Sequence, residues 1–310
     1  MKKISIITPV FNEEDNIIDL IDEVKSILSS INNIIYEHIF IDNCSTDRSV
    51  QILRNVASDY KNIKVILNSK NFGYARSSFY GILQASGDAV ILMSADLQDP
   101  PYLLKYFIEN WQNGKKIILA QKKRTSESFL IKHTRKIFYK LIKKISDTKL
   151  TINTIGFGIF DSSIINEIRK INDPYPYFRG LITEISDEIH LVQYDQPIRK
   201  KGITKFKFLD MYDLAITGIV KHSKTPIRVF VLLGFFLCVF SLIIGIIYFI
   251  YKILNWNSFA TGVAPLLIGF FILGSFQLFF LGLIGEYIIS INNQVRNIPL
   301  VFEKERINFD

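Results

Sequence analysis

The sequence is poor in cysteine, and its two cysteines stand far apart. Cys44 lies beside a loop signal and Cys238 lies inside an apolar run, so they form neither a disulfide framework nor a metal-binding spacing. This usage is typical of a reducing compartment. The opening residues, MKKISIITPVF, lack a signal peptide because their apolar run is short and Pro9 interrupts it. We therefore expect the amino-terminal part of the chain to stay in the cytoplasm.

Two glycine-rich phosphate-binding patterns are missing as well. No G-x-G-x-x-G follows the first predicted strand and no G-x-x-x-x-G-K-[ST] occurs, which excludes the dinucleotide-binding and P-loop classes. The chain also has no internal repeat and no disordered linker.

Apolar and basic residues are abundant. Hydrophobic residues make up 49% of the chain and the net charge is +8. The mean hydropathy of +0.23 is high for a purely soluble enzyme. Lysine and arginine cluster near the hydrophobic segments, which indicates an anionic membrane surface or a phosphate-bearing partner and argues against nucleic acid.

Two long stretches, 229–251 and 263–284, contain no charged residue. Each is long enough to span about 30 Å of hydrocarbon. Basic residues flank the pair on both outer sides, whereas the short loop between them has a single lysine, Lys252. This charge pattern predicts a multi-pass membrane protein with both termini in the cytoplasm. A buried hydrophobic hairpin of a soluble protein is the alternative.

Two basic amphipathic stretches, 129–145 and 205–224, precede the first span. Such helices lie on anionic lipid surfaces, although core-facing helices with a charged outer face are the alternative. The second stretch leads directly into the predicted hairpin. We therefore expect four parts: a catalytic domain (1–204), an interfacial segment (205–228), a transmembrane hairpin (229–287) and a cytoplasmic tail (288–310).

The first half of the chain alternates strand and helix signals. Periodic apolar positions predict helices, with Asn12 capping the first and Ser45 or Thr46 capping the second. Such alternation predicts an α/β fold with a mostly parallel sheet covered on both faces. Short β-branched or apolar runs predict the strands, at 4–8, 38–41, 65–67 and 89–93.

Three loops converge at one edge of this sheet. Pro9, Asp42 and Asp96 each follow a different predicted strand, and ligands of such sheets bind beyond the carboxyl ends of the strands. Glu13 and Asp42 could accept hydrogen bonds from the base or ribose of a nucleotide. Asp96 with Gln98 could hold a cation on its diphosphate.

The segment 89–101, AVILMSADLQDPP, places acidic residues directly after a buried strand. Asp96, Gln98 and Asp99 are hard oxygen ligands on one turn, which suits a divalent cation that carries substrate phosphates. Alternatively, the acidic residues of the turn cap the next helix, which we expect to start near Tyr102. Both interpretations stay open at this point.

Taken together, these motifs resemble the family 2 glycosyltransferases that act on polyprenyl phosphates, the group that contains dolichol-phosphate mannose synthase and bacterial undecaprenyl-phosphate glucosyltransferases. The resemblance covers nearly the whole chain and implies a GT-A fold, which is Rossmann-like, with interfacial amphipathic helices and two C-terminal transmembrane helices. The motifs that carry it are TPVFNEEDNI, IDNCSTDRSV, NFGYARSSFYGI, SGDAVILMSADLQDPP, YFRGL and RKKGITKF.

The resemblance also implies the site residues. Arg199 and Lys205 would be positive groups near the phosphates, with solvated loop charges as the alternative. By this resemblance the nucleotide-sugar residues are Pro9, Glu13, Asp42, Ser94, Ala95 and Lys122; the metal ligands for Mg²⁺ or Mn²⁺ are Asp96 and Gln98; the catalytic residues are Asp96, Arg199 and Lys205.

Three positions depart from the family pattern, and each departure removes a charge. The family's Asp-Asp pair is Asp42-Asn43 here, and the first acid of the DAD triplet is Ser94. Gly156 stands where many relatives carry the acid of Gly-Asp-Phe-Arg. Losing that acid matters only if the reaction needs a general base. Gly156 and Gly158 could instead shape a pocket for a different sugar.

The activity implied is inverting transfer of a sugar from a nucleotide-diphosphate donor, a UDP-sugar, to undecaprenyl phosphate at the cytoplasmic membrane face. The product would serve glycan decoration across the membrane, and relatives suggest a homotetramer. Two alternatives stay open: a glycosyltransferase that acts on a hydroxyl of a lipid-linked saccharide, and a catalytically degenerate scaffold that binds lipid phosphate.

Overall fold

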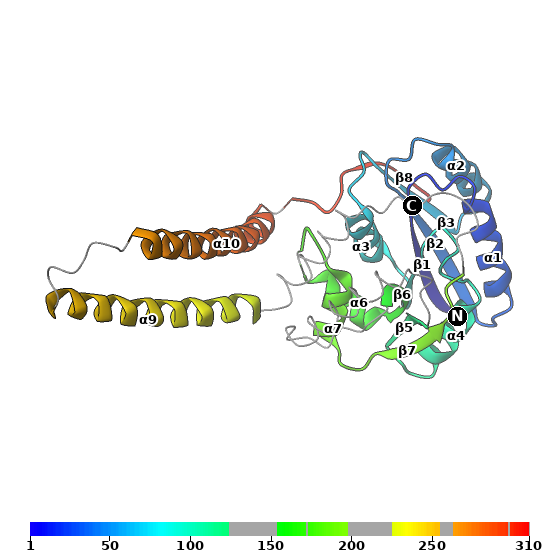
Figure 1. Cartoon of the computed structure of the whole chain (residues 1–310). Coiled ribbons are helices and arrows are strands. Elements are labelled where there is room, and N and C mark those ends of the chain that lie inside the picture. The colour runs from blue at the N-terminus through cyan, green and yellow to red at the C-terminus, as the bar shows by residue number, and fades with distance from the viewer. Residues whose placement is uncertain (124–153, 172, 198–224, 255–262, 297, 310) are drawn as a thin grey trace.

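The computed structural model describes residues 1–123, 154–171, 173–197, 225–254, 263–296 and 298–309. These residues form one mixed sheet covered by helices, and two long helices that extend from it (Figure 1). The stretch 129–145 and the stretch 205–224, both predicted to be amphipathic helices, lie outside the described residues.

The sheet has eight strands in the order β7-β5-β6-β4-β1-β2-β3-β8. Strands β1 to β4 run parallel to one another, β5 and β7 are parallel to each other, and β6 and β8 run antiparallel to their neighbours. The strands are β1 (Lys2–Val10), β2 (Ile34–Asp42), β3 (Ile63–Asn68), β4 (Ala89–Leu92), β5 (Ile117–Lys122), β6 (Thr154–Asp161), β7 (His190–Tyr194) and β8 (Glu303–Ile307). The predicted α/β fold with a largely parallel sheet is confirmed in the first half of the chain.

Helices cover both faces of the sheet because successive strand residues point to opposite sides. In β1, Ile4 and Ile6 pack into one apolar cluster, while Ile7 packs into the other. The first cluster also contains side chains of α1 (Ile17–Ser29), α2 (Ser49–Asp59) and α4 (Leu103–Gln112). The second contains side chains of α3 (Tyr74–Gln84), α6 (Ser162–Arg169) and α7 (Phe178–Ile185).

The predicted helix caps are wrong. Helix α1 begins at Ile17 with Asn16 in the capping position, and Asn12 adopts a left-handed conformation with φ of 54°. Helix α2 begins at Ser49 and is preceded by Arg48, not by Ser45 or Thr46. The three polar side chains that we expected to cap helices bond to the neighbouring loop instead.

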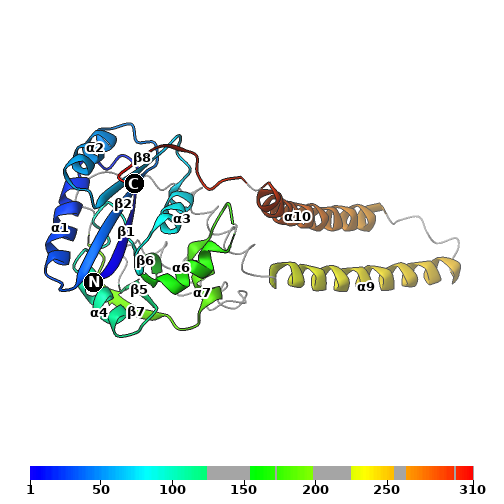
Figure 2. The same ribbon diagram turned by 180° about the vertical axis from the view of Figure 1, so that it is seen from behind.

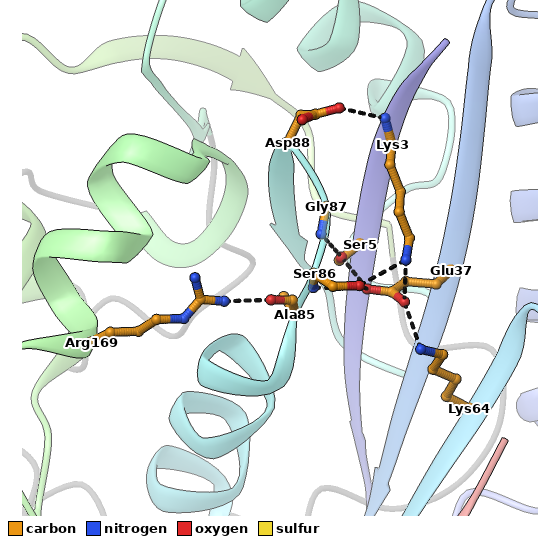
Figure 3. A network of polar contacts seen from close by, with 9 residues as sticks. All are labelled: Lys3, Ser5, Glu37, Lys64, Ala85, Ser86, Gly87, Asp88 and Arg169. Atoms are coloured by element: carbon orange, nitrogen blue, oxygen red, sulfur yellow. Dashed lines mark hydrogen bonds and ion pairs between the residues drawn. The ribbon is translucent and has the colours of Figure 1, made fainter. Parts of the chain in front are cut away.

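A buried carboxylate ties the amino-terminal halves of the strands together (Figure 3). Glu37 of β2 is 2% exposed and pairs with the ammonium groups of Lys3 and Lys64, at 2.9 and 3.0 Å. Its other oxygen accepts hydrogen bonds from the Ser5 hydroxyl at 2.5 Å and from the Ser86 amide at 2.9 Å. Buried charges are stable only when they are paired in this way.

The helices α9 (Thr225–Leu254) and α10 (Val263–Val295) run alongside each other, away from the sheet, in both views (Figures 1 and 2). Their described apolar side chains are largely exposed, as Phe236 and Leu278 illustrate. Among the described residues, one segment, Phe276–Val295, has the length and apolar composition to cross a membrane. The predicted pair of spans therefore stays a proposal.

The sequence analysis did not predict the last strand. Residues 288–295 belong to α10, and β8 then pairs antiparallel with β3 at the edge of the sheet, inside the segment that we had expected to be a tail. The sequence of β8, EKERI, has almost no apolar residues, so its pattern resembles a solvated segment. Side chains hold it in place: Asn308 donates to the carbonyls of Ala57 and Ile63.

Candidate functional site

The carboxyl ends of β1, β2 and β4 lie next to one another. Val10 is in register with Asp42, and the amide of Asn43 donates to the carbonyl of Val10 at 2.8 Å. On the other side of β1, the amide of Met93 donates to the carbonyl of Ile7 at 3.0 Å. Pro9 lies within this buried end of β1. Asp42, the last residue of β2, and the turn that carries Asp96 after β4 thus lie on either side of the end of β1.

Asp42 presents a buried acceptor at this edge. Its carboxylate is 1% exposed, and one oxygen accepts the amide of Ser45 at 3.0 Å. The other oxygen, Oδ1, has no hydrogen-bond partner in the described part of the chain. Burial raises the pKa of Asp42, against the hydrogen bonds from Ser45 that lower it. A buried acceptor without a partner is costly unless a ligand donates to it, which suits an N–H of a base or an O–H of a ribose.

Side-chain hydrogen bonds join the loops that follow β1 and β2. The Thr46 amide donates to Asn12 Oδ1 at 2.7 Å, and the Asn12 amide donates to Ser45 Oγ at 2.9 Å. The carboxylate of Glu13 accepts from Asn16 at 2.7 Å, at the start of α1. Glu13 therefore lies in the expected loop, and its contact with a nucleotide stays a prediction.

The turn after β4 is closed by Asp99. One oxygen of this residue accepts the amide of Ser94 at 2.9 Å, and Leu97 adopts a left-handed conformation with φ of 58°. Asp99 is 1% exposed, so it holds the turn and does not cap α4, which begins at Leu103. Asp96 is less buried, and its Oδ1 accepts the amide of Gln98 at 3.2 Å. The two acids of the turn thus have different roles, and Asp96 is the one that a ligand can reach.

Three further side chains surround Asp99: Lys122 at the end of β5, Tyr194 at the end of β7, and Tyr74 at the start of α3. Burial raises the pKa of Asp99 to about 6; hydrogen bonds from Ser94 oppose the rise, and Lys122 opposes it by its charge. Burial also raises the pKa of Tyr194, and the charge of Asp99 adds to this effect.

Tyr74 belongs to the same group. Tyr74 is 45% exposed as a residue, so the burial concerns its hydroxyl end. That burial raises the pKa of the hydroxyl to about 12, and the charge of Asp99 adds to the rise. In the described residues, Asp99 Oδ1 and the Tyr194 hydroxyl have no hydrogen-bond partner that meets the usual geometry. The sequence analysis missed both tyrosines. Tyr74 stands in the motif NFGYARSSFYGI, which was the one signal for it, while Tyr194 carries no signal in a single sequence.

The residues present fit a divalent cation that arrives with its substrate. No group of three or more His, Cys, Asp or Glu side chains lies together in the described residues. Asp96 and Gln98 offer one carboxylate and one amide oxygen. Magnesium ions are usually held by one or two carboxylates plus the phosphates of the substrate, so this small donor set suits a cation bound mainly by a diphosphate.

Position 156 requires glycine for its backbone. Gly156 has φ of +95°, a conformation that other residues rarely adopt. Space is not the reason, because a Cβ atom there would make ordinary contacts with Leu92 at 3.5 Å and with Phe178 at 3.8 Å. Gly158 has a different reason, because a Cβ atom there would lie 2.2 Å from the carbonyl of Ile118 in β5. The sheet thus explains Gly158 without a sugar pocket, and an acid at position 156 would strain the backbone.

Arg199 and Lys205, the predicted phosphate-binding cations, lie outside the described residues. Of the other predicted site residues, Pro9, Asp42, Ser94, Ala95, Asp96, Gln98 and Lys122 all lie at the carboxyl edge of the sheet, on β1, β2, β4 and β5 or directly after them.

The mixed α/β sheet thus carries a buried carboxylate at the end of β2 and an acidic turn after β4. Residues 5–169 match the family described as glycosyl transferase family 2. The chain belongs to this family, as the sequence motifs predicted.

Relatives and solved structures agree with this assignment. The SfII prophage-derived bactoprenol glucosyl transferase of Shigella flexneri is 32% identical over 298 residues, which cover 96% of each chain. An uncharacterized glycosyltransferase of Synechocystis is 31% identical over 96% of this chain and 93% of its own. Glucosyl-3-phosphoglycerate synthase of Mycobacterium tuberculosis, solved with Mn²⁺, UDP and glucosyl-3-phosphoglycerate, has a TM-score of 0.50 at 17% identity, over 71% of this chain and 78% of that one. This structural likeness confirms the predicted GT-A fold, and the family confirms that the chain is a glycosyltransferase.

Proposed function

We propose that this glycosyltransferase moves a sugar from a UDP-sugar to the phosphate of undecaprenyl phosphate, at the cytoplasmic face of the bacterial plasma membrane. The observation that carries the proposal is the glycine at position 156: it stands where many members of the family carry an acid, and its φ of +95° disfavours any side chain. A site without that acid suits an acceptor that needs no general base.

A phosphate acceptor meets this condition. The second pKa of a phosphomonoester is near 6, so roughly nine tenths of a lipid phosphate is dianionic at neutral pH. Its oxygen attacks the anomeric carbon, the bond from that carbon to the diphosphate breaks, and the nucleoside diphosphate leaves; one displacement inverts the configuration. A hydroxyl acceptor would first have to lose its proton to a base. The relatives named bactoprenol glucosyl transferase support a polyprenyl carrier.

The donor side of the proposal rests on the carboxyl edge of the sheet. The unpaired oxygen of Asp42 is suited to accept a hydrogen bond from the nucleoside. Asp99 holds the turn that presents Asp96 and Gln98, and Lys122 brings positive charge to the same place. Mg²⁺ or Mn²⁺ on Asp96 and Gln98 would supply charge against the leaving diphosphate. The UDP and Mn²⁺ in the structural neighbour support both assignments.

The two long helices support a membrane location. Exposed apolar side chains on α9 and α10 are costly in water and favourable in lipid. We propose that both helices span the bilayer, so that the catalytic domain and both termini stay on the cytoplasmic side. A site held above the headgroups would meet the lipid phosphate at a fixed height, and such positioning is a large part of catalysis.

The test is a donor panel. Full-length protein in nanodiscs is mixed with UDP- and GDP-sugars and with undecaprenyl phosphate, a lipid-linked saccharide or no acceptor. Release of nucleotide and binding of the lipid phosphate are measured. We expect release from a UDP-sugar that depends on the lipid phosphate. Release with a lipid-linked saccharide alone would support a hydroxyl acceptor instead. Lipid binding without release from any donor would support a scaffold.

A further inference from the structure

The loop between β3 and α3 (residues 69–73) is held from the side of the donor site by Asn43. The amide of Phe72 donates to Asn43 Oδ1 at 2.8 Å, and Asn43 Nδ2 donates to Asn71 Oδ1 at 2.7 Å. Asn43 directly follows Asp42, and an aspartate in its place could accept but not donate. Asparagine at position 43, where the family pair has a second acid, is thus explained by the structure: its side chain both accepts from the loop and donates to it.

The same loop is held from the opposite side by residues 299–302, which we call the C-terminal brace. The amide of Ser69 donates to the carbonyl of Phe302 at 2.8 Å, and the rings of Phe72 and Phe302 lie 6.1 Å apart. Arg76, in the first turn of α3, donates to the carbonyls of Leu300 and Pro299 at 2.8 and 2.9 Å.

Arg76 is suited to this role by its shape. Its planar guanidinium lies over the rings of Phe72 and Tyr175, at 5.1 and 4.9 Å from their centroids, which fixes its orientation. A planar fork of donors can reach the carbonyls of two successive residues at once, which a lysine cannot do equally well. One side chain therefore fastens the loop and α3 to the brace.

The brace follows α10 closely. Val295 ends the helix and Pro299 begins the brace, so the connection can extend over no more than about 14 Å. The brace is in turn fixed to the sheet by β8, which directly follows it. The covalent chain therefore tethers the brace to the end of α10, and hydrogen bonds join the brace to the loop beside Asp42 and to α3.

We propose that Arg76 is a positioning residue that couples the end of α10 to the donor site through the brace, the loop 69–73 and Asn43. The affinity for the nucleotide then depends on contacts of the brace, which begins four residues beyond the end of α10. This inference rests on the proposed function, because it assumes that the donor nucleotide binds at Asp42. The coupling changes the affinity for the donor nucleotide. The apolar helices themselves are expected to face lipid and not the donor.

The test compares UDP binding by isothermal titration calorimetry for full-length protein in nanodiscs. We expect R76A to bind UDP about fivefold more weakly or worse, since coupling between linked sites is typically of that size. R76K should recover part of the affinity, because its ammonium still reaches one carbonyl. The control is E305A, which removes an exposed ion pair with Arg54 further along the same segment, away from the loop, and should bind UDP as wild type does.

Two further readouts distinguish coupling from general damage. Hydrogen exchange at the amides of Ser69 and Phe72 should become faster in R76A and stay unchanged in E305A. In turnover, R76A should raise the donor KM and leave kcat nearly unchanged. N43D removes the hydrogen bond from Asn43 to Asn71, on the donor-site side of the loop, and should weaken UDP binding as R76A does. If R76A fails to fold, N43D is compared with E305A in its place.

Each outcome has a definite meaning. Unchanged UDP affinity in R76A and N43D would overturn the coupling while the proposed function stands. Equal weakening in R76A and E305A would also overturn it, because the effect would then not pass through the loop. If the wild-type protein binds neither UDP nor GDP, the proposed function fails, and the coupling fails with it.

Discussion

Two buried carboxylates on the same strand behave in opposite ways. Glu37 and Asp42 both belong to β2 and are 2% and 1% exposed. The pKa of Glu37 is lowered to about 2: burial raises it, but hydrogen bonds from Ser5, Lys3, Ser86 and Lys64 outweigh that effect. The pKa of Asp42 is raised by burial, because hydrogen bonds from Ser45 do not compensate.

The difference separates the structural end of the sheet from the functional one. Towards the amino ends of the strands, the polar groups around Glu37 are paired with one another (Figure 3). At the carboxyl ends, oxygens of Asp42 and Asp99 lack partners within the described residues. What distinguishes the two carboxylates of β2 is that both oxygens of Glu37 are compensated, one by hydrogen bonds and the other by two ion pairs, whereas one oxygen of Asp42 is not. Four predictions break or sharpen this contrast, from the largest effect to the smallest.

Asp96→Ala should have the largest effect. We expect transfer to fall by about 10³-fold, because the group that faces the developing charge of the diphosphate is removed. The melting temperature should change little, since Asp96 is only partly buried and lies in a turn that Asp99 closes. Activity and thermal unfolding are measured on the same detergent-solubilised protein. Asp22→Ala, which removes an exposed acid on α1, is the control, and retained turnover in the Asp96 variant would exclude Asp96 from the mechanism.

Glu37→Ala should lower the stability of the fold and leave the affinity for UDP unchanged, the reverse of Asp96→Ala. Removing one member of a buried ion-pair network costs about 3 kcal/mol of unfolding free energy, the lower end of the usual range, because Lys3 and Lys64 are partly exposed and can reach water. The melting temperature should fall by roughly 6–12 °C. UDP affinity at low temperature should stay as in wild type. Glu167→Ala removes an exposed ion pair with Lys170 and serves as the control; an equal loss in both variants would mean that the Glu37 network adds nothing specific.

The same network predicts a dependence on acid. The pKa of Glu37 is lower in the folded chain than its ordinary 4.5, so its stabilising effect is complete above pH 4.5 and is lost as pH falls through about 2. We expect about 2 kcal/mol of this stabilisation to be gone by pH 3. Thermal unfolding of wild type and Glu37→Gln is compared at pH 7 and pH 3, since the variant lacks this titration but keeps all other carboxylates. A gap between the two proteins that does not shrink at pH 3 would contradict the assignment.

The two ends of the sheet also differ in how far the sequence predicted them. Asp42 and Asp96 were found because each follows an apolar strand, and the alternation of strands and helices puts those ends on one edge. Tyr194 was missed, and Asn43 was noted only as a departure from the family's acidic pair. Their roles depend on which strands and loops become neighbours, and a single sequence does not give this. The strand β8 was missed for a related reason: its charged residues gain their place from side-chain contacts, such as Glu305 with Arg54 and Arg306 with Tyr80, not from an apolar pattern.

Asp42→Asn should have the smallest effect and is the most direct comparison with Glu37. A pKa raised in the folded chain means that the charged carboxylate destabilises the fold at neutral pH, so the neutral amide should leave the melting temperature equal or slightly higher. UDP should bind about tenfold more weakly, close to the loss of one hydrogen bond to a charged group. Calorimetric titration with UDP and thermal unfolding without it provide the two values. A lower melting temperature with unchanged UDP affinity would place Asp42 with Glu37 among the structural carboxylates, and the nucleotide would then have to bind through other residues.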